Sequence, residues 1–153
     1  MKRVEVDLYR IIYCSRTNLG GSPAAVSATV AQIVAASRRN NARDGVTGGL
    51  LYSAGSFAQV LEGPLPAITQ AFERIQSDER HSDVTVVQFG PAPSRAFGEW
   101  SMLSHVDARD GSAAAALEAG LAGQTEAGAQ ILHFLQTVML NDTEDHRDPA
   151  SAY

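Results

Sequence analysis

Two predicted strands place hydrogen-bonding side chains on faces that are otherwise apolar. In the segment 8–14, Tyr9, Ile11 and Tyr13 share a side, because alternate residues of a strand point the same way. In the segment 57–61, the amide of Gln59 falls on the same side as two apolar residues. An unpaired amide in a core costs about 1–3 kcal/mol, so Gln59 needs a partner. Taken alone, a neighbouring backbone group or a tyrosine hydroxyl is the simplest partner.

Other polar or bulky residues have equally simple structural explanations when each is considered singly. Trp100 and Met102 share a side of the last predicted strand, where they indicate packing at a sheet edge. Asn41 indicates a helix cap, Asp78 a local turn, and Arg80 a solvated charge after a helix. The structural explanation is the stronger one for each residue by itself, and only their joint pattern favours a functional site.

The elements that must position these residues follow from the apolar periodicity. Short apolar runs bounded by turn residues indicate strands, and apolar residues at helical spacing indicate helices. The predicted strands are 8–14, 46–52, 57–61, 84–89 and 100–106, and the predicted helices are 24–40 and 66–77. The order β-α-β-β-α-β-β is typical of a ferredoxin-like α+β sheet with two helices on one face. The groove between those helices is a natural place for a flat ligand.

The chain changes composition after residue 106. The stretch 112–140 is rich in Ala and Leu and is predicted to form two helices, broken near Gly120 and Gly123. Its apolar face, which includes Ile131 and Leu135, must be covered by the sheet or by another copy of the chain. We therefore expect a ligand-binding domain at 1–106, a C-terminal helical cap at 107–140 and a flexible acidic tail at 141–153.

Composition narrows the classes of function. The 153 residues carry a net charge of −5, and an acidic surface repels the phosphates of nucleic acids. No apolar run approaches the roughly 18 residues that span a bilayer, and no apolar segment follows the N-terminal charges as in a signal peptide. The single cysteine, Cys14, fits a reducing compartment. These patterns predict a cytoplasmic protein that binds neither nucleic acid nor membrane.

The residues singled out above belong to a longer series of motifs. In chain order the motifs are Ile12–Arg16, Ser37–Arg43, Val46–Tyr52, Phe57–Gly63, Asp78–His81 and Phe97–Met102. This series resembles the BLUF domains, the blue-light sensors that use FAD. It covers about residues 8–106 in the family's order, and a set of this length is far more specific than a lone glycine pattern. The choice of FAD over FMN comes from this resemblance alone.

The resemblance implies a photoactive group of residues. Tyr13 would hydrogen-bond Gln59 and donate an electron to the light-excited flavin, and Gln59 would lie between Tyr13 and the flavin N5 and O4 edge. An amide has a donor end and an acceptor end, so rotation or tautomerisation of Gln59 would change which groups it can bond. The altered hydrogen bonds would then bias the last strand through Trp100 or Met102.

The resemblance also implies a set of cofactor contacts. Ile33 and Ile75 would enclose the flavin ring from the two helices, and Asn41 would bond the polar O4 and N3 edge. Asp78 and Arg80 would hold the pyrimidine side of the ring or the ribityl chain. The remaining candidates near the cofactor are Ser37 and His81.

The implied function is a photoreceptor that is not an enzyme. No cyclase, phosphodiesterase or kinase segment is seen after the domain, so we expect output through a signalling protein in trans or through a dimer. A flavin-dependent reductase is the first alternative, but no glycine-rich dinucleotide fingerprint follows a strand. An RNA-binding ferredoxin-like module is the second, and it would need basic charge on the sheet. The four histidines show no metal-ligand spacing.

Overall fold

The computed structural model describes residues 7–17, 22–53, 55–98, 100–106 and 111–141. The elements are β1 (Leu8–Thr17), α1 (Pro23–Asp44), β2 (Thr47–Ser53), β3 (Ser56–Pro64), α2 (Leu65–Gln76), β4 (His81–Pro91), β5 (Leu103–Val106), α3 (Gly111–Leu121) and α4 (Glu126–Asn141). The predicted order of strands and helices is confirmed, including the two C-terminal helices. The predicted tail lies outside the described residues, apart from Asn141 at the end of α4.

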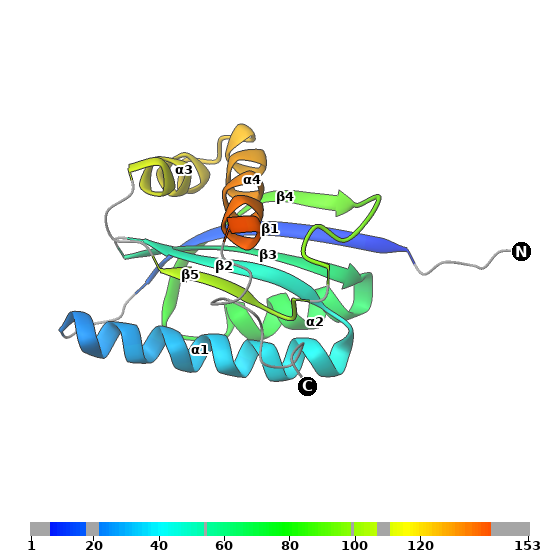
Figure 1. Ribbon diagram of the computed structural model, residues 1–153, viewed down its shortest axis with the longest axis horizontal. Coiled ribbons are helices and arrows are strands. Elements are labelled where there is room, and N and C mark those ends of the chain that lie inside the picture. The colour runs from blue at the N-terminus through cyan, green and yellow to red at the C-terminus, as the bar shows by residue number, and fades with distance from the viewer. Residues whose placement is uncertain (1–6, 18–21, 54, 99, 107–110, 142–153) are drawn as a thin grey trace, which may run out of the picture.

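A single five-stranded sheet organises the molecule, with the strand order β4-β1-β3-β2-β5. β1 pairs antiparallel with β3 and β4, β2 pairs antiparallel with β3, and β5 adds in parallel to β2. Helices α1 and α2 cover one face, and α3 and α4 lie on the opposite face (Figure 1). The ferredoxin-like prediction is therefore confirmed. The apolar face of the C-terminal helices is covered by the sheet of the same chain.

Successive strand residues point to opposite sides of the sheet. Because helices pack on each side, both faces are buried. Facing α1 and α2 is a cluster that contains Ile11, Phe57 and Leu61, as the predicted alternation requires. Facing α3 and α4 is a second cluster that contains Ile12 and Cys14 on β1. A second group in that cluster comes from the C-terminal helices: Leu117, Ile131 and Leu135. β1 therefore lies between two cores and touches both pairs of helices.

Helix α1 is longer than the sequence predicts. Ser22 caps its N-terminus, and the Ser22 Oγ accepts a hydrogen bond from Ala25 N at 3.1 Å. We predicted its end near Asn40 and Asn41, but it continues to Asp44. Gly45 ends it with φ of 75°, a left-handed conformation that costs glycine no side-chain clash, and the Gly45 N–H bonds Asn41 O. The cap role considered for Asn41 is therefore wrong.

The last strand is shorter than predicted, and this changes where its first residues point. β5 begins only at Leu103, so residues 100–102 lie outside the strand. Trp100 packs with the cluster on the α3 and α4 side, whereas Met102 is buried in the cluster on the α1 and α2 side. The prediction that Trp100 and Met102 share a side is wrong, because strict alternation holds only within a regular strand.

Candidate functional site

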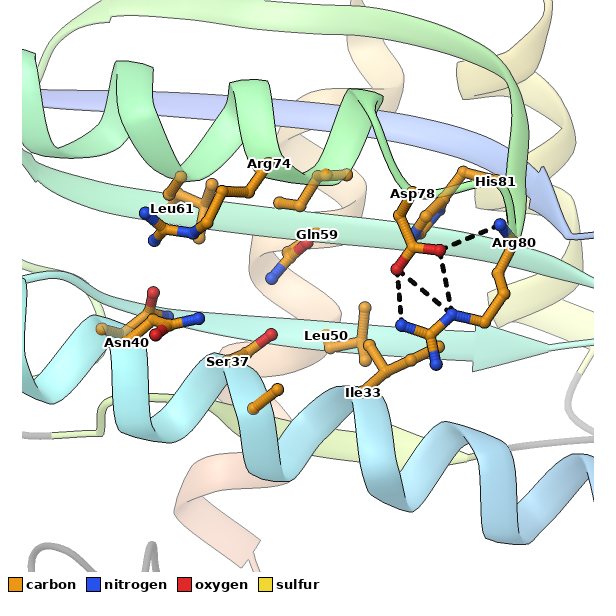
Figure 2. A pocket seen from close by; sticks show the side chains of 14 residues that line it. Ile33, Ser37, Asn40, Leu50, Gln59, Leu61, Arg74, Asp78, Arg80 and His81 are labelled. Carbon is orange, nitrogen blue, oxygen red and sulfur yellow. Dashed lines mark hydrogen bonds and ion pairs between the residues drawn. The ribbon is translucent and has the colours of Figure 1, made fainter.

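A cleft opens between α1 and α2 over the centre of the sheet, with a volume of about 600 Å³ including the part open to solvent. It is lined by Ile33, Ala36, Ser37, Asn40, Asn41, Leu50, Gln59, Leu61, Ala71, Arg74, Ile75, Asp78, Arg80 and His81. Every residue predicted to contact a cofactor is in this lining. Figure 2 shows the side chains of Asn40 on α1 and Arg74 on α2 at one end of the cleft, Ile33 towards the other end, and Gln59 on the strand between the helices.

The floor of the cleft holds a buried tyrosine–glutamine pair. Tyr13 on β1 lies directly opposite Gln59 on β3 in the antiparallel register. The Tyr13 hydroxyl donates a hydrogen bond to Gln59 Oε1, and the two side chains are buried. The ring of Phe72 on α2 packs edge-on to Tyr13, with 5.4 Å between ring centroids. Burial raises the pKa of Tyr13 well above its ordinary value, so this phenol remains a neutral donor at physiological pH.

The other end of the Gln59 amide is weakly paired. Within the described residues, Gln59 Nε2 donates only to Met102 Sδ, at 3.7 Å. Thioether sulfur is a weak acceptor, and the amide nitrogen carries two N–H groups. Figure 2 shows this nitrogen directed into the space between the two helices. A buried donor with so poor a partner fits a planar ligand that presents acceptor atoms at its edge.

The placement of Met102 answers the question that the sequence left open between it and Trp100. Met102 is fully buried beside Gln59, and Arg38 Nε holds its backbone oxygen at 3.0 Å. Trp100 contacts the opposite core. In this structure it is therefore Met102, and not Trp100, that lies beside Gln59.

One end of the cleft carries charge. Arg80 Nε donates to Asp78 Oδ1 at 2.9 Å, and the Arg80 backbone N–H donates to the same oxygen at 3.0 Å (Figure 2). These hydrogen bonds hold the pKa of Asp78 below its ordinary value. Asp78 pairs with only part of the Arg80 guanidinium, and the rest faces the cleft. There it can donate hydrogen bonds to polar ring atoms or to a phosphate.

His81 closes the same end of the cleft. Its Nδ1 lies 2.9 Å from Ser15 Oγ on β1, and its ring lies 5.1 Å from that of Phe57. Burial lowers the pKa of His81, although Asp78 acts in the opposite direction. The imidazole is therefore mainly neutral at physiological pH and contributes shape and a hydrogen-bonding group to the cleft.

Asn41 is the polar residue at the other wall. It is buried on α1, and its Nδ2 donates to Ser101 O at 2.8 Å. This bond ties the wall of the cleft to the residue that precedes Met102. The carboxamide oxygen of Asn41 makes no hydrogen bond with the described residues, so it can accept one from a bound group.

The sequence analysis did not predict several residues that line the cleft. They are Ala36, Asn40, Leu50, Leu61, Ala71 and Arg74. Helical spacing offered a signal for one of them, because Asn40 follows Ser37 by three positions on α1. Leu50 lies opposite Gln59 in the β2–β3 register, and only the strand pairing reveals that.

The ferredoxin-like fold and this cleft define a small ligand-binding α+β domain, and comparison with known proteins makes the class specific. Residues 8–103 match the model of the BLUF family, sensors of blue light using FAD. A solved structure of BlrB, a BLUF protein in its dark state, aligns with a TM-score of 0.69 and 31% sequence identity. That alignment covers 86% of this chain and 96% of BlrB. The chain belongs to the BLUF family, which confirms the predicted fold class, blue-light sensing function and FAD cofactor.

Curated relatives match over shorter stretches. The photoactivated adenylate cyclase subunit beta of Euglena gracilis is 41% identical over 73 residues, which is 47% of this chain and 8% of that protein. The blue light- and temperature-regulated antirepressor BluF of Escherichia coli K12 is 33% identical over 73 residues, 48% of this chain and 18% of that protein. This chain thus corresponds to a small part of each. BLUF domains are sensory modules.

Two further observations concern the described residues as a whole. None of their helices combines the length and apolar character needed to cross a membrane. No three of their His, Cys, Asp or Glu side chains gather where they could hold a metal ion.

Proposed function

We propose that FAD binds in the cleft between α1 and α2 and that Tyr13 and Gln59 form the photoactive pair beneath it. Ile33 on α1 and Ile75 on α2, which both line the cleft, would pack against the ring. Asn41 would bond its polar edge. The set of further contacts proposed for the cofactor is Ser37, Asp78, Arg80 and His81.

The observation that carries this proposal is the asymmetry of the Gln59 amide. Its oxygen accepts from Tyr13, while its nitrogen has only a sulfur partner within the described residues. Bound FAD supplies light absorption and an electron acceptor. The protein supplies a neutral buried phenol and an amide whose two ends can exchange roles. Reversal of the amide would direct its nitrogen to Tyr13 and its oxygen towards Met102, which removes the hydrogen bond to the sulfur.

The signal would leave the site through Met102 and through the helices on the far face of the sheet. Met102 is attached to α1 by Arg38, and α3 and α4 share a core with β1 and β3. We infer that this chain acts as a sensory module without catalysis of its own, in the cytoplasm, as a dimer or on a signalling protein in trans. Its relatives include a photoactivated adenylate cyclase subunit and an antirepressor, which supports output of this kind.

The test is a visible spectrum of protein purified in darkness, recorded before and after a blue flash. A flavin band that shifts slightly to the red and recovers in darkness is expected. Gln59→Leu and Tyr13→Phe should retain the flavin and lose the shift. Tyr9→Phe, on the same face of β1 but stacked on Phe89 at 6.1 Å, is the matched control and should keep it.

Two results would contradict the proposal. Protein that is colourless after purification with added FAD would remove the flavin assignment. Flavin that is bleached by NADH but does not shift with light would favour the reductase instead.

A further inference from the structure

A second buried polar group lies close to the cleft but faces away from it. Glu62 is on β3, three residues after Gln59, and its side chain is fully buried. Its Oε1 accepts hydrogen bonds from Thr47 Oγ1 and from Phe97 N, each at 2.9 Å. Its Oε2 accepts from Ala96 N at 2.9 Å and from the guanidinium of Arg10 on β1, with which it forms an ion pair at 3.4 Å. The carboxylate is thus surrounded by donors, two of which are backbone N–H groups of one segment.

That segment, residues 95–102, is the later part of the connection between β4 and β5 and will be called the connecting segment. Its described residues have no regular secondary structure. Besides Glu62, its start is held by Arg95, which donates to Thr47 Oγ1 at 2.8 Å and to Gly45 O at 2.9 Å. Its backbone is bonded to a neighbouring strand at Trp100 O, which accepts from Gly48 N on β2 at 3.1 Å, so the rest of its described residues depend on the side chains that bind them.

The end of the connecting segment is the part that reaches the cleft. Asn41 holds Ser101 O, and Arg38 holds Met102 O. Met102 Sδ then lies 3.7 Å from Gln59 Nε2. The start and the end of the segment are therefore attached to different elements, β3 at one end and α1 at the other.

We propose that Glu62 is a positioning residue that fixes the connecting segment on β3 and so keeps Met102 against Gln59. The inference rests on the proposed function, in which Gln59 is the residue that responds to light. The ring of Phe97 also holds the segment, because it is fully buried in the core on the α3 and α4 side. With that ring and two backbone N–H groups held, the chain towards Met102 has little freedom to slide.

The chemistry explains why a carboxylate is needed at this position. An ionised carboxylate is an acceptor at each oxygen, whereas a glutamine amide has one acceptor and one donor group. In Glu62→Gln, the new NH₂ group would face either Ala96 N–H or the donors at Oε1. One buried N–H then loses its partner, although the volume and shape of the side chain hardly change.

The experiment compares the wild type with Glu62→Gln and with Glu118→Gln, the same change at an exposed position on α3. Trp100 is the single tryptophan of the chain and lies in the connecting segment, so its emission reports the segment in flavin-free protein. In Glu62→Gln we expect red-shifted Trp100 emission and amide exchange at Ala96 and Phe97 faster by about tenfold or more. Flavin-loaded Glu62→Gln should recover in darkness at least about threefold faster, because Gln59 has lost a restraint.

The outcomes separate this inference from the proposed function. A wild type without a light-induced shift defeats the proposed function, and with it the role of Glu62 in the response. A normal wild type in which Glu62→Gln matches Glu118→Gln in emission, exchange and recovery overturns the inference. Loosening of the segment with unchanged recovery also overturns it. If Glu62→Gln does not fold, Thr47→Val removes one donor to the carboxylate and should move all three readouts in the same directions by smaller factors.

Discussion

A close approach between α3 and the sheet at Gly120 allows a test of how they are coupled. Gly120 on α3 lies directly over Cys14, the neighbour of Tyr13 on β1. A Cβ added at Gly120 would lie 2.3 Å from Cys14 Sγ and 3.4 Å from Val87 Cγ2. No such contact occurs in a relaxed structure, so in Gly120→Ala either α3 or the Cys14 side chain must move.

The size of the effect follows from two opposing contributions. Overpacking of a buried contact costs about 1–3 kcal/mol. Alanine in place of glycine inside a helix stabilises by about 1 kcal/mol. We expect Gly120→Ala to lower the free energy of unfolding by about 1 kcal/mol, and by about 2 kcal/mol at most. Gly128→Ala on α4 is the matched control, because the atom its Cβ would meet, at 2.9 Å, is the end of the exposed Gln88 side chain, which can swing aside.

The assay is urea unfolding of Gly120→Ala, Cys14→Ala, the double variant and Gly128→Ala. Removal of the Cys14 sulfur leaves room for the new methyl group. The free energy of unfolding of the double variant should therefore be about 1 kcal/mol or more higher than the sum of the two single changes predicts. Gly128→Ala should be neutral or slightly stabilising. Equal effects at Gly120 and Gly128 within about 0.5 kcal/mol, or simple additivity with Cys14→Ala, would refute the proposed contact.

Three further predictions follow from burial and close approach. Gly48→Ala should prevent stable folding, because its Cβ would lie 2.0 Å from Val60 O, while Gly90→Ala, with no atom within 4 Å, should express and melt normally. Burial raises the pKa of Cys14 to about 12, so Ellman's reagent at pH 8 should label this thiol only after unfolding, and rapid labelling of folded protein would contradict its burial. Burial lowers the pKa of His81 in the folded state below 6.5, so as pH falls the unfolded chain binds the proton first. The stability of the wild type should therefore fall as pH drops through 6.5. His81→Phe should lose less stability over that interval, as measured by melting temperature against pH.

Local patterns in the sequence were sufficient for the elements and for most of the cleft. Strand alternation placed Tyr13 and Gln59 on apolar, inward faces, an assignment that depends only on the geometry of one strand. Ile33 and Ile75 came from the motif resemblance, and both line the cleft. Motif resemblance added the roles, which geometry within one element cannot supply.

The tertiary structure decided every relation between distant segments. The β1–β3 register alone sets Tyr13 opposite Gln59, and only packing shows that Met102, rather than Trp100, reaches that amide. The irregular segment before β5 has no period from which side-chain direction can be read. Two of its N–H groups bind the carboxylate of Glu62, more than thirty residues earlier in the chain. A sequence pattern describes neighbours along the chain, whereas these contacts exist because folding brings separate segments into one core.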